Sequence, residues 1–213
     1  VLLVASQFDR YILEESGYLA EILQEEYSIL NLSQAPRIIH SPDAEDAMGL
    51  LNTRKFDLII TMSKVGMMDA NTFANMVKDI HEGIPVVLLS QNTRELATLE
   101  TGDGIDRIFV WGGDSRILLS ICKLIEDEKN VENDVREGDV QVILLVEDSR
   151  RFYSAYLPLL YTQLVRQTSR LIGDGGNLHE KLLRLRARAK ILLASDMDLS
   201  LIHISEPTRR TPI

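Results

Sequence analysis

Short apolar runs alternate with longer stretches of helical periodicity along the first 127 residues of the chain. Runs of Val, Ile and Leu bounded by polar residues are typical of strands buried on both faces of a parallel sheet. Five such runs are predicted to be strands: Val1–Ser6, Arg37–His40, Phe56–Met62, Ile84–Ser90 and Arg107–Trp111. Because each run is followed by a helical stretch, we predict an α/β fold. It is a doubly wound five-stranded parallel sheet of order 2-1-3-4-5, with helices on both faces.

The helical stretches between these strands have defined starts. Five are predicted: Asp9–Tyr27, a helix after Ser41, a helix with Phe73, Met76, Val77 and Ile80 on its inner face, Thr93–Leu99, and a helix capped by Asp114. Ser41-Pro42 indicates a helix start, because Ser accepts a hydrogen bond from an early amide and Pro suits the first helical position. Ser63–Asp69, which contains Gly66, is predicted to be a loop.

The opening of the chain has a second copy later in the sequence. Val1–Ser6 aligns with Ile143–Asp148, 142 residues later, and Arg37–Ile39 aligns with Lys190–Leu192, 153 residues later. Self-similarity of this kind indicates a repeated structural unit. We therefore predict a second unit of the same type as the first.

The second unit begins with Val140–Ser149, another apolar run predicted to be a strand buried on both faces. Its other predicted elements are a helix over Arg150–Ile172, bent or restarted near Pro158, a basic helix over Asn177–Arg188, and a strand over Lys190–Ser195. Glu126–Asp139 precedes it with seven acidic residues against two basic ones, which predicts a solvated helix end or linker. A basic stripe is expected to be solvated or to pair with that acidic stretch; it consists of Lys181, Arg184, Arg186, Arg188 and Lys190.

These patterns predict a division into four parts. Residues 1–127 form the first unit, 128–139 an acidic linker or helix extension, and 140–198 the opening part of a truncated second unit. The remaining part, 199–213, is expected to be an artefact, because Leu199–Arg209 resembles the in-frame translation of a sequencing adapter. The chain opens on Val1 without a Met, and we expect it to be a fragment at that end as well.

Composition and net charge argue against several classes of function. Hydrophobic residues make up 45% of the chain, which is ample for a buried core. The net charge of −9 argues against nucleic-acid and anionic-membrane binding. The single cysteine, Cys122, excludes an internal disulfide, and the sequence shows neither a signal peptide nor a spanning segment. We expect a cytoplasmic protein.

Several of these stretches resemble response-regulator receiver domains, the CheY-like members of the flavodoxin-like fold. The stretches are VLLVAS (1–6), DAEDAMGLLNTRKFDLIITM (43–62) with MMDA (67–70), IPVVLLS (84–90), IFVWGGD (108–114) and, in the second copy, ILLVEDS (143–149). The resemblance implies transfer of a phosphoryl group from a histidine kinase to an aspartate. It also implies four site components: an acidic pair holding Mg²⁺, an acceptor Asp ending the third strand, a Ser or Thr ending the fourth, and a Lys ending the fifth.

In the first unit, three of these four components are missing. The acidic pair falls on Ala5 and Ser6, which cannot hold a cation, and the acceptor falls on Met62, whose thioether has no nucleophilic oxygen. Ser90 retains the hydroxyl, and Trp111 occupies the lysine position. The resemblance therefore implies a degenerate phosphorylation site and a pseudo-receiver with no catalytic residue.

In the second copy, Glu147 and Asp148 match the acidic pair. The resemblance implies a Mg²⁺ site there only in an intact second receiver, because its other components would lie beyond the truncation. We expect no cofactor in residues 1–213 as they stand. Two further carboxylates near the same end of the first sheet, Asp9 and Asp69, are interpreted as solvated helix caps.

A second resemblance covers residues 109–135, 140–164 and 179–194. These stretches resemble the regulatory front end of bacterial proteins related to phosphoenolpyruvate synthase and pyruvate phosphate dikinase. Such proteins carry two receiver-like units ahead of an ATP-dependent phosphotransferase domain. The resemblance implies a parent of that kind, and neither an ATP-grasp nor a phosphohistidine segment is present in this chain.

The expected function is regulatory and non-enzymatic, within two-component phosphorelay signalling. A pseudo-receiver acts by binding, and we expect the surface over about Thr93–Glu126 to do so. The expected partner is a histidine kinase or a C-terminal effector domain of the parent, with no nucleic acid and no membrane; a homodimer is left open. The alternatives are an ordinary phosphorylated regulator, and the regulatory part of a phosphoenolpyruvate synthase-like enzyme whose catalytic domain is missing here.

Overall fold

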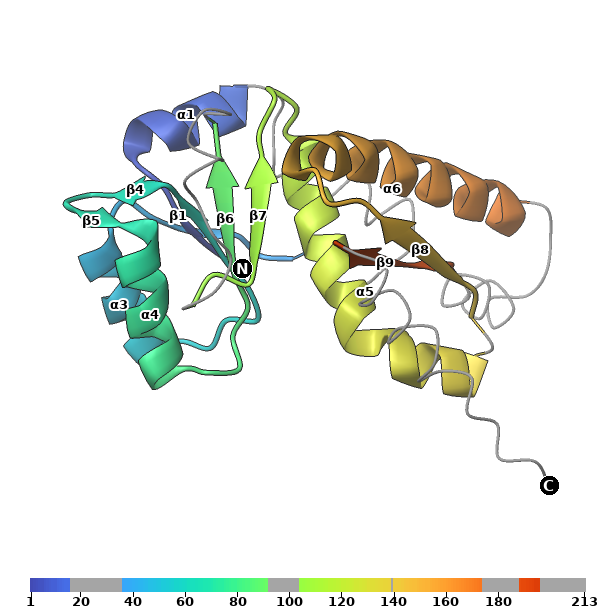
Figure 1. Cartoon of the computed structure of the whole chain (residues 1–213), viewed down its shortest axis with the longest axis horizontal. Helices are drawn as coiled ribbons and strands as arrows, with labels where there is room; N and C mark the ends of the chain where they lie inside the picture. Colours follow the sequence, from blue (N-terminus) through green and yellow to red (C-terminus); the bar gives the residue numbers. More distant parts are fainter. Residues whose placement is uncertain (16–35, 92–103, 139, 174–187, 196–213) are drawn as a thin grey trace. The chain divides into compact units, whose positions relative to one another are not determined.

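The computed structural model describes residues 1–15, 36–91, 104–138, 140–173 and 188–195. The described residues form two compact units, one up to Ile117 and one from Leu118 onward (Figure 1). Some predicted features lie outside the described residues: the later part of Asp9–Tyr27, the helices over Thr93–Leu99 and 177–187, and the segment 199–213.

The first unit is a five-stranded parallel sheet. Its strands are β1 (Leu2–Val4), β2 (Ile39–Ser41), β3 (Ile59–Met62), β6 (Val86–Ser90) and β7 (Arg107–Val110). They are arranged in the order β2-β1-β3-β6-β7, and every neighbouring pair is parallel. This is the doubly wound, flavodoxin-like order that the alternation of strands and helices predicted, so the predicted fold class is confirmed.

Two helices cover one face of this sheet and build the main core. Helix α3 (Ala44–Thr53) and helix α4 (Ala70–Ile80) contribute small and apolar side chains that pack against alternate residues of the strands. The core members are Leu2, Val4, Ala44, Ala47, Leu51, Phe56, Ile59, Val65, Ala70, Phe73, Ala74, Val77, Val86, Leu88, Ile105 and Ile108. A further helix, α1 (Gln7–Glu15), follows β1 and buries Leu13.

The inner face of α4 differs from the prediction. Phe73 and Val77 are buried as expected, but Met76 and Ile80 are exposed. The buried stripe also contains Ala70 and Ala74, at helical spacing from Phe73 and Val77. These two alanines shift the centre of the stripe, so the larger side chains at 76 and 80 fall outside it.

The predicted start of α3 is wrong. Asp43, rather than Ser41, is the N-cap, and its carboxylate accepts a hydrogen bond of 2.9 Å from the backbone N–H of Asp46. Ser41 is the last residue of β2, and its hydroxyl donates to the carbonyl of Asp43 and to the Asp46 carboxylate, both at 2.9 Å. Ser and Asp are both good N-caps, so the sequence alone does not choose between neighbouring candidates.

A short hairpin replaces the loop predicted between β3 and α4. Strands β4 (Lys64–Val65) and β5 (Met68–Asp69) pair antiparallel around Gly66. Gly66 has φ 73°, and a Cβ there would lie 3.0 Å from the Cβ of Asp43. The turn therefore requires glycine for both its backbone conformation and its close contact.

The second unit contains a parallel pair of strands and two long helices. Helix α5 (Arg116–Gly138) starts in the first unit and continues through the second. It is followed by β8 (Val142–Val146), helix α6 (Arg150–Gly173) and β9 (Lys190–Ala194). Strands β8 and β9 pair in parallel, from Val142 with Lys190 to Val146 with Ala194. Helix α6 runs through Pro158 as one element, so the predicted restart is absent.

One prediction about this unit is wrong, and a second holds only in part. Strand β8 is not buried on both faces: Val142, Ile143 and Val146 are 38%, 36% and 41% exposed. The acidic stretch, predicted to be a solvated helix end or linker, is the end of helix α5 up to Gly138, but its Asp127 is fully buried rather than solvated. The predicted boundary after residue 127 therefore falls inside a continuous helix.

Candidate functional site

The residues predicted to form a degenerate phosphorylation site gather at one edge of the first sheet. Parallel strands end at the same edge, and Val4 pairs with Thr61, Met62 with Leu89, and Ser90 with Val110. Met62 and Ser90 end their strands, and Trp111 directly follows β7. Ala5 and Ser6 are the two residues after β1. Figure 1 shows this edge at the arrowheads of β6 and β7. The structure thus brings together all five positions implied by the resemblance.

The side chains at this edge are mostly buried and apolar. Ala5 is fully buried, and Met62 is almost so. Ser90 is buried, and its backbone carbonyl accepts a hydrogen bond of 2.9 Å from the backbone N–H of Trp111. The indole Nε1 of Trp111 is buried and has no hydrogen-bond partner within the described part of the chain. Burying a donor without a hydrogen bond costs free energy, so the indole N–H is an energetically unfavourable feature of this edge.

A carboxylate does lie at this edge, but it belongs to the start of α1. Asp9 donates its backbone N–H to the hydroxyl of Ser6 at 3.1 Å, and that hydroxyl donates to the Asp9 carboxylate at 2.7 Å. The side-chain amide of Gln91 donates to the other carboxylate oxygen at 3.1 Å. The Ser6-Gln-Phe-Asp9 spacing is that of a reciprocal helix cap, and the Gln91 contact is the part that sequence reasoning missed.

Asp69 has a comparable role at the start of α4. Its carboxylate accepts hydrogen bonds from the Thr72 hydroxyl at 2.7 Å and the Thr72 backbone N–H at 3.0 Å. These bonds, the hydroxyl's first, lower the pKa of Asp69. Asp69 is therefore a helix cap, as interpreted from the sequence, whereas Asp9 lies in the first turn of α1 and its backbone N–H is capped by Ser6.

The carboxyl edge of the first sheet does not offer the donors that Mg²⁺ requires. The methyl of Ala5 and the thioether of Met62 stand where hard oxygen ligands are needed. Within the described ranges, no three His, Cys, Asp or Glu side chains are clustered in a way that could hold a metal ion. The residues present at this edge do not fit the ion that the fold family implies.

The corresponding edge of the second unit has a different chemistry. Glu147 directly follows β8, donates its backbone N–H to the Ala194 carbonyl at 3.0 Å, and is half-buried. Its carboxylate accepts a hydrogen bond of 2.9 Å from the backbone N–H of Ser149. Asp148 is exposed beside it. Two adjacent carboxylates at the end of a parallel strand are the oxygen donors that Mg²⁺ favours, so these residues fit the ion by donor type.

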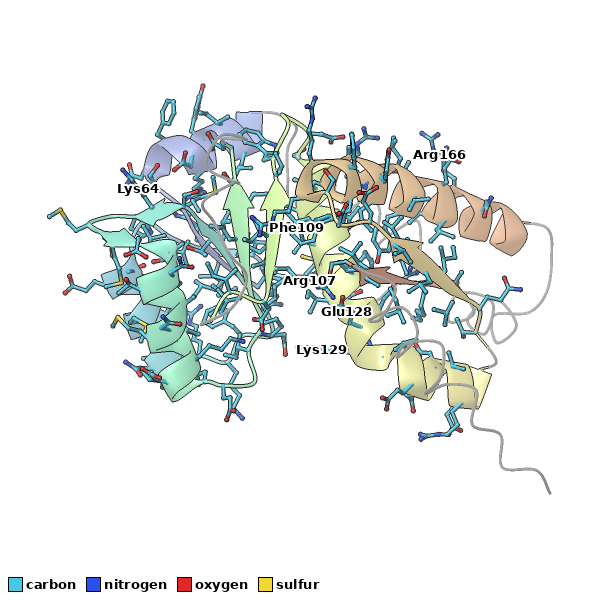
Figure 2. The ribbon with its side chains drawn as sticks, in the orientation of Figure 1. Lys64, Arg107, Phe109, Glu128, Lys129 and Arg166 are labelled. Atoms are coloured by element: carbon cyan, nitrogen blue, oxygen red, sulfur yellow. The ribbon has the colours of Figure 1, made fainter. Side chains whose placement is uncertain are left out.

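The second unit also contains a buried ionic cluster that the sequence analysis did not assign. Asp127 of α5 accepts hydrogen bonds from the Tyr161 hydroxyl at 3.1 Å, from the backbone N–H of Ile191 at 3.0 Å and from both terminal nitrogens of Arg188. The Arg188 guanidinium also lies 5.7 Å from the centre of the Tyr161 ring. Glu128 and Lys129, the next residues along α5, are labelled in Figure 2.

Lys190 joins this cluster to a second carboxylate. Its Nζ lies 2.7 Å from Asp134 and 3.8 Å from Asp127. The expected pairing of the basic stripe with the acidic stretch is confirmed for Arg188 and Lys190, and the other members lie outside the described residues. Burial, followed by the charge of Asp127, raises the pKa of Tyr161 well above its ordinary value.

A sequence signal for this cluster does exist. Asp127 stands at helical spacing from Ser120, Leu124 and Val131, all of which are buried. A carboxylate in an inward-facing stripe needs a cationic partner, and Arg188 and Lys190 lie just before and at the start of β9. Cys122, on the same helix, is buried as predicted, and burial raises the pKa of its thiol to about 12.

Comparisons with known proteins give similarities to receiver domains. No family model and no curated protein sequence matches the chain. The signal receiver domain of an HD domain-containing protein from Pseudomonas fluorescens is 22% identical, with a TM-score of 0.43. The match covers 61% of this chain and 95% of that one. The receiver domain of Francisella response regulator 1452 is 17% identical, with a TM-score of 0.40, over 60% of this chain and 97% of that one.

A third similarity extends over more of this chain. NtrX from Brucella abortus, solved in complex with ATP, is 16% identical with a TM-score of 0.44. The match covers 88% of this chain and 40% of NtrX. The fold assignment depends on the strand order β2-β1-β3-β6-β7 rather than on these similarities. The chain is thus a doubly wound α/β protein that resembles signal receiver domains.

Proposed function

We propose that the chain is a non-catalytic signalling module. It consists of a receiver-like unit that cannot accept a phosphoryl group and the N-terminal part of a second receiver-like unit. The observation that carries this proposal is the buried side chain of Met62 at the carboxyl end of β3, where phosphoryl transfer would need a carboxylate. A thioether cannot form an acyl phosphate.

The rest of the edge supports the same conclusion. Phosphoryl transfer depends on positioning and on neutralising the charge of the transferred group. Ala5 supplies no metal ligand, and Trp111 supplies an uncharged donor where a cation would be needed. The nearby carboxylate of Asp9 is already bonded to Ser6 and Gln91. The edge therefore retains the geometry of a receiver without its reactive groups.

A unit of this kind signals by binding a protein. We propose a histidine kinase or an effector domain of the parent protein as partner, in the cytoplasm, and neither a nucleic acid nor a membrane. The proposed surface comprises about Thr93–Glu126, of which 104–126 are described. None of the described helices is long and apolar enough to span a bilayer.

The proposed module is tested by incubation with acetyl phosphate and Mg²⁺. An intact receiver domain serves as positive control, and phosphate incorporation is measured by intact-protein mass spectrometry. We expect no added phosphate on this chain, because position 62 has no oxygen nucleophile. A hydroxylamine-sensitive phosphoryl group in the first unit would contradict the proposal and favour an ordinary phosphorylated regulator.

In the second unit, Glu147 and Asp148 would hold Mg²⁺ once that unit is intact. The support is their position at the carboxyl end of β8, together with their oxygen donors. Bound there, the ion would neutralise charge on an incoming phosphoryl group. The role of the two side chains is to hold and orient it.

A second candidate is that the chain is the regulatory part of a phosphoenolpyruvate synthase-like phosphotransferase. The resemblance of residues 109–135, 140–164 and 179–194 to the front end of such proteins supports it. Under this candidate the catalytic chemistry belongs to a separate domain of the parent. ATP turnover by these 213 residues alone would contradict the non-catalytic assignment, and a phosphate-release assay measures it.

A further inference from the structure

Methionine side chains gather on the surface that α3, α4 and the β4–β5 hairpin form in the first unit. Four of the six methionines of the chain belong to these elements: Met48, Met67, Met68 and Met76. Met48 and Met68 are partly buried against the main core, whereas Met67, Met76 and Ile80 are exposed. These five residues form the methionine face. They belong to residues 36–91, a stretch that the structure describes without a gap.

Helix α4 turns its exposed apolar side chains toward α3. A Cβ at Gly104 would meet the backbone of Ala74 and Asn75, so the segment before β7 lies against the Ala74 flank of α4. Met76 and Ile80, one helical turn apart, are on the opposite flank. Since β7 is at one end of the sheet order and β2 at the other, this second flank faces α3.

Helix α3 in turn presents Met48 to α4. Both helices connect parallel strands and therefore run in the same direction across the sheet. Met48 directly follows the buried Ala47, as Ala74 follows the buried Phe73 in α4, so Met48 is on the flank of α3 that faces α4. Figure 1 shows the β4–β5 hairpin at the beginning of α4. Gly66 of this hairpin approaches the N-cap of α3, so the hairpin connects the two helix starts.

The charges around the methionine face are mainly acidic. Glu45 is exposed on the Met48 flank of α3, and Asp79 is exposed in the last turn of α4, three residues after Met76. An acid near a helix C-terminus is unfavourable, so the position of Asp79 has no structural explanation within α4. Helix α3 contains no basic residue, and Lys78 of α4 is paired with Asp106 at 2.7 Å.

We propose that the methionine face binds a basic amphipathic helix of a partner protein. The apolar side of this helix packs against Met48, Met76 and Ile80, and its Lys and Arg side chains lie against Glu45 and Asp79. Methionine is flexible and polarizable, which suits it to binding apolar helix faces. The methionine face lies outside the surface proposed over about Thr93–Glu126, and the inference does not depend on that surface.

Other occupants fit this face less well. A second copy of the chain bound through the same face would bring Glu45 and Asp79 near like charges. Nucleic acids and anionic membranes would be repelled by the same carboxylates. An added strand needs unpaired backbone groups, whereas the backbone of α3 and α4 is hydrogen-bonded within each helix. A partner helix as long as the 11-residue α4 spans roughly 16 Å, or three turns.

The proposal is tested by fluorescence anisotropy with labelled peptides and the full 213-residue chain. The basic probe is LKKLLKLLKKLLKL, which is amphipathic at helical spacing. The acidic probe LEELLELLEELLEL has the same apolar pattern, and LKLKLKLKLKLKLK is basic at strand spacing. We expect saturable binding of the basic helical probe, about tenfold tighter or more than that of either other peptide, because only this probe matches both charge and periodicity.

Matched variants locate the binding site. D79K and M76K should each weaken binding of the basic helical probe about five- to tenfold, because the first repels its cations and the second removes an apolar contact. E132K makes the same charge change as D79K on α5, and F8K places a lysine at an exposed apolar position of α1. Both controls should stay within about twofold of the unchanged chain.

Each alternative result overturns a defined part of the proposal. Absence of binding by the basic helical probe, or equal binding of the acidic probe, would overturn the charge of the partner. Equal binding of the strand-spaced peptide would overturn the helical conformation. Binding that is insensitive to D79K and M76K, or that E132K and F8K weaken as strongly, would place the site elsewhere. Circular dichroism confirms that each variant is folded.

Discussion

A carboxylate without exposed surface is stable only where its oxygens meet donors, and Asp127 meets this requirement. The hydroxyl of Tyr161, the guanidinium of Arg188 and the backbone N–H of Ile191 all donate to it. Removing one member of a buried pair is far more costly than removing an exposed charge, because the other member stays buried without compensation. The cluster therefore fixes α5 to β9 within the second unit.

The first prediction at this scale concerns D127N. The substitution keeps the size of the side chain but leaves Arg188 and Lys190 without their buried counter-charge, so we expect a loss of about 3 to 5 kcal/mol in the free energy of unfolding. Urea denaturation followed by circular dichroism measures it. E132Q, at an exposed acidic position of the same helix, is the control and should stay within about 0.5 kcal/mol. Equal stability of D127N and E132Q would show that the cluster does not hold the unit together.

A second prediction concerns the ionisation of Tyr161. Its pKa is raised in the folded protein, so its contribution to stability is fully present below the unfolded value of about 10 and is lost as pH rises through the folded value. In an absorbance titration at alkaline pH, we expect Tyr161 to ionise last, together with unfolding of the second unit. Y161F should remove this late step. An unchanged titration in Y161F would show that Tyr161 ionises with the exposed tyrosines.

At the scale of elements, the apolar runs were sufficient to find the five strands, because buried parallel strands form distinct apolar runs. The alternation of strands and helices then predicted the parallel sheet and its order. Apolar periodicity did not predict features that depend on hydrogen bonds and turn geometry between neighbouring residues. Asp43 replaced Ser41 as a helix cap, and the β4–β5 hairpin formed in a stretch of turn-like composition. The helical spacing of Asp127 indicates an inward-facing position, but its partner Arg188 lies 61 residues away, and no local pattern identifies it. The five positions of the candidate site lie at one edge of the sheet because they all come at or just after strand ends.

The approach of α4 to the segment before β7 gives a prediction at this scale. Gly104 has φ 120°, and a Cβ there would lie 2.7 Å from the backbone carbon of Ala74 and 2.8 Å from the nitrogen of Asn75. G104A should therefore destabilise the first unit by about 1 to 3 kcal/mol. G49A, in α3, is the matched control, because a Cβ there meets nothing within 4 Å; it should stabilise by about 0.5 to 1 kcal/mol. Thermal unfolding of both variants measures the difference.

At the scale of the whole molecule, the helix α5 belongs to both units. Arg116 and Ile117 lie in the first unit, and the helix continues to Gly138 in the second. The second unit therefore begins well before the acidic stretch ends. A boundary drawn at residue 140 would separate Arg188 and Lys190 from Asp127 and Asp134.

This arrangement predicts different behaviour for two shortened chains. A chain that starts at Val140 lacks both carboxylates of the cluster, and we expect it to show no cooperative unfolding. A chain that starts at Arg116 retains them and should unfold in a single transition, which circular dichroism detects. Cooperative unfolding of the shorter chain would show that α5 is dispensable for the second unit.

The position of Trp111 has a practical consequence. It is the single tryptophan of the chain, and it is buried at the carboxyl edge of the first sheet, where its indole nitrogen has no hydrogen-bond partner among the described residues. Its emission spectrum responds to the polarity around the ring and to hydrogen bonding at that nitrogen. The native protein therefore carries its own fluorescent reporter at this edge, so titrations with candidate partners need no added dye.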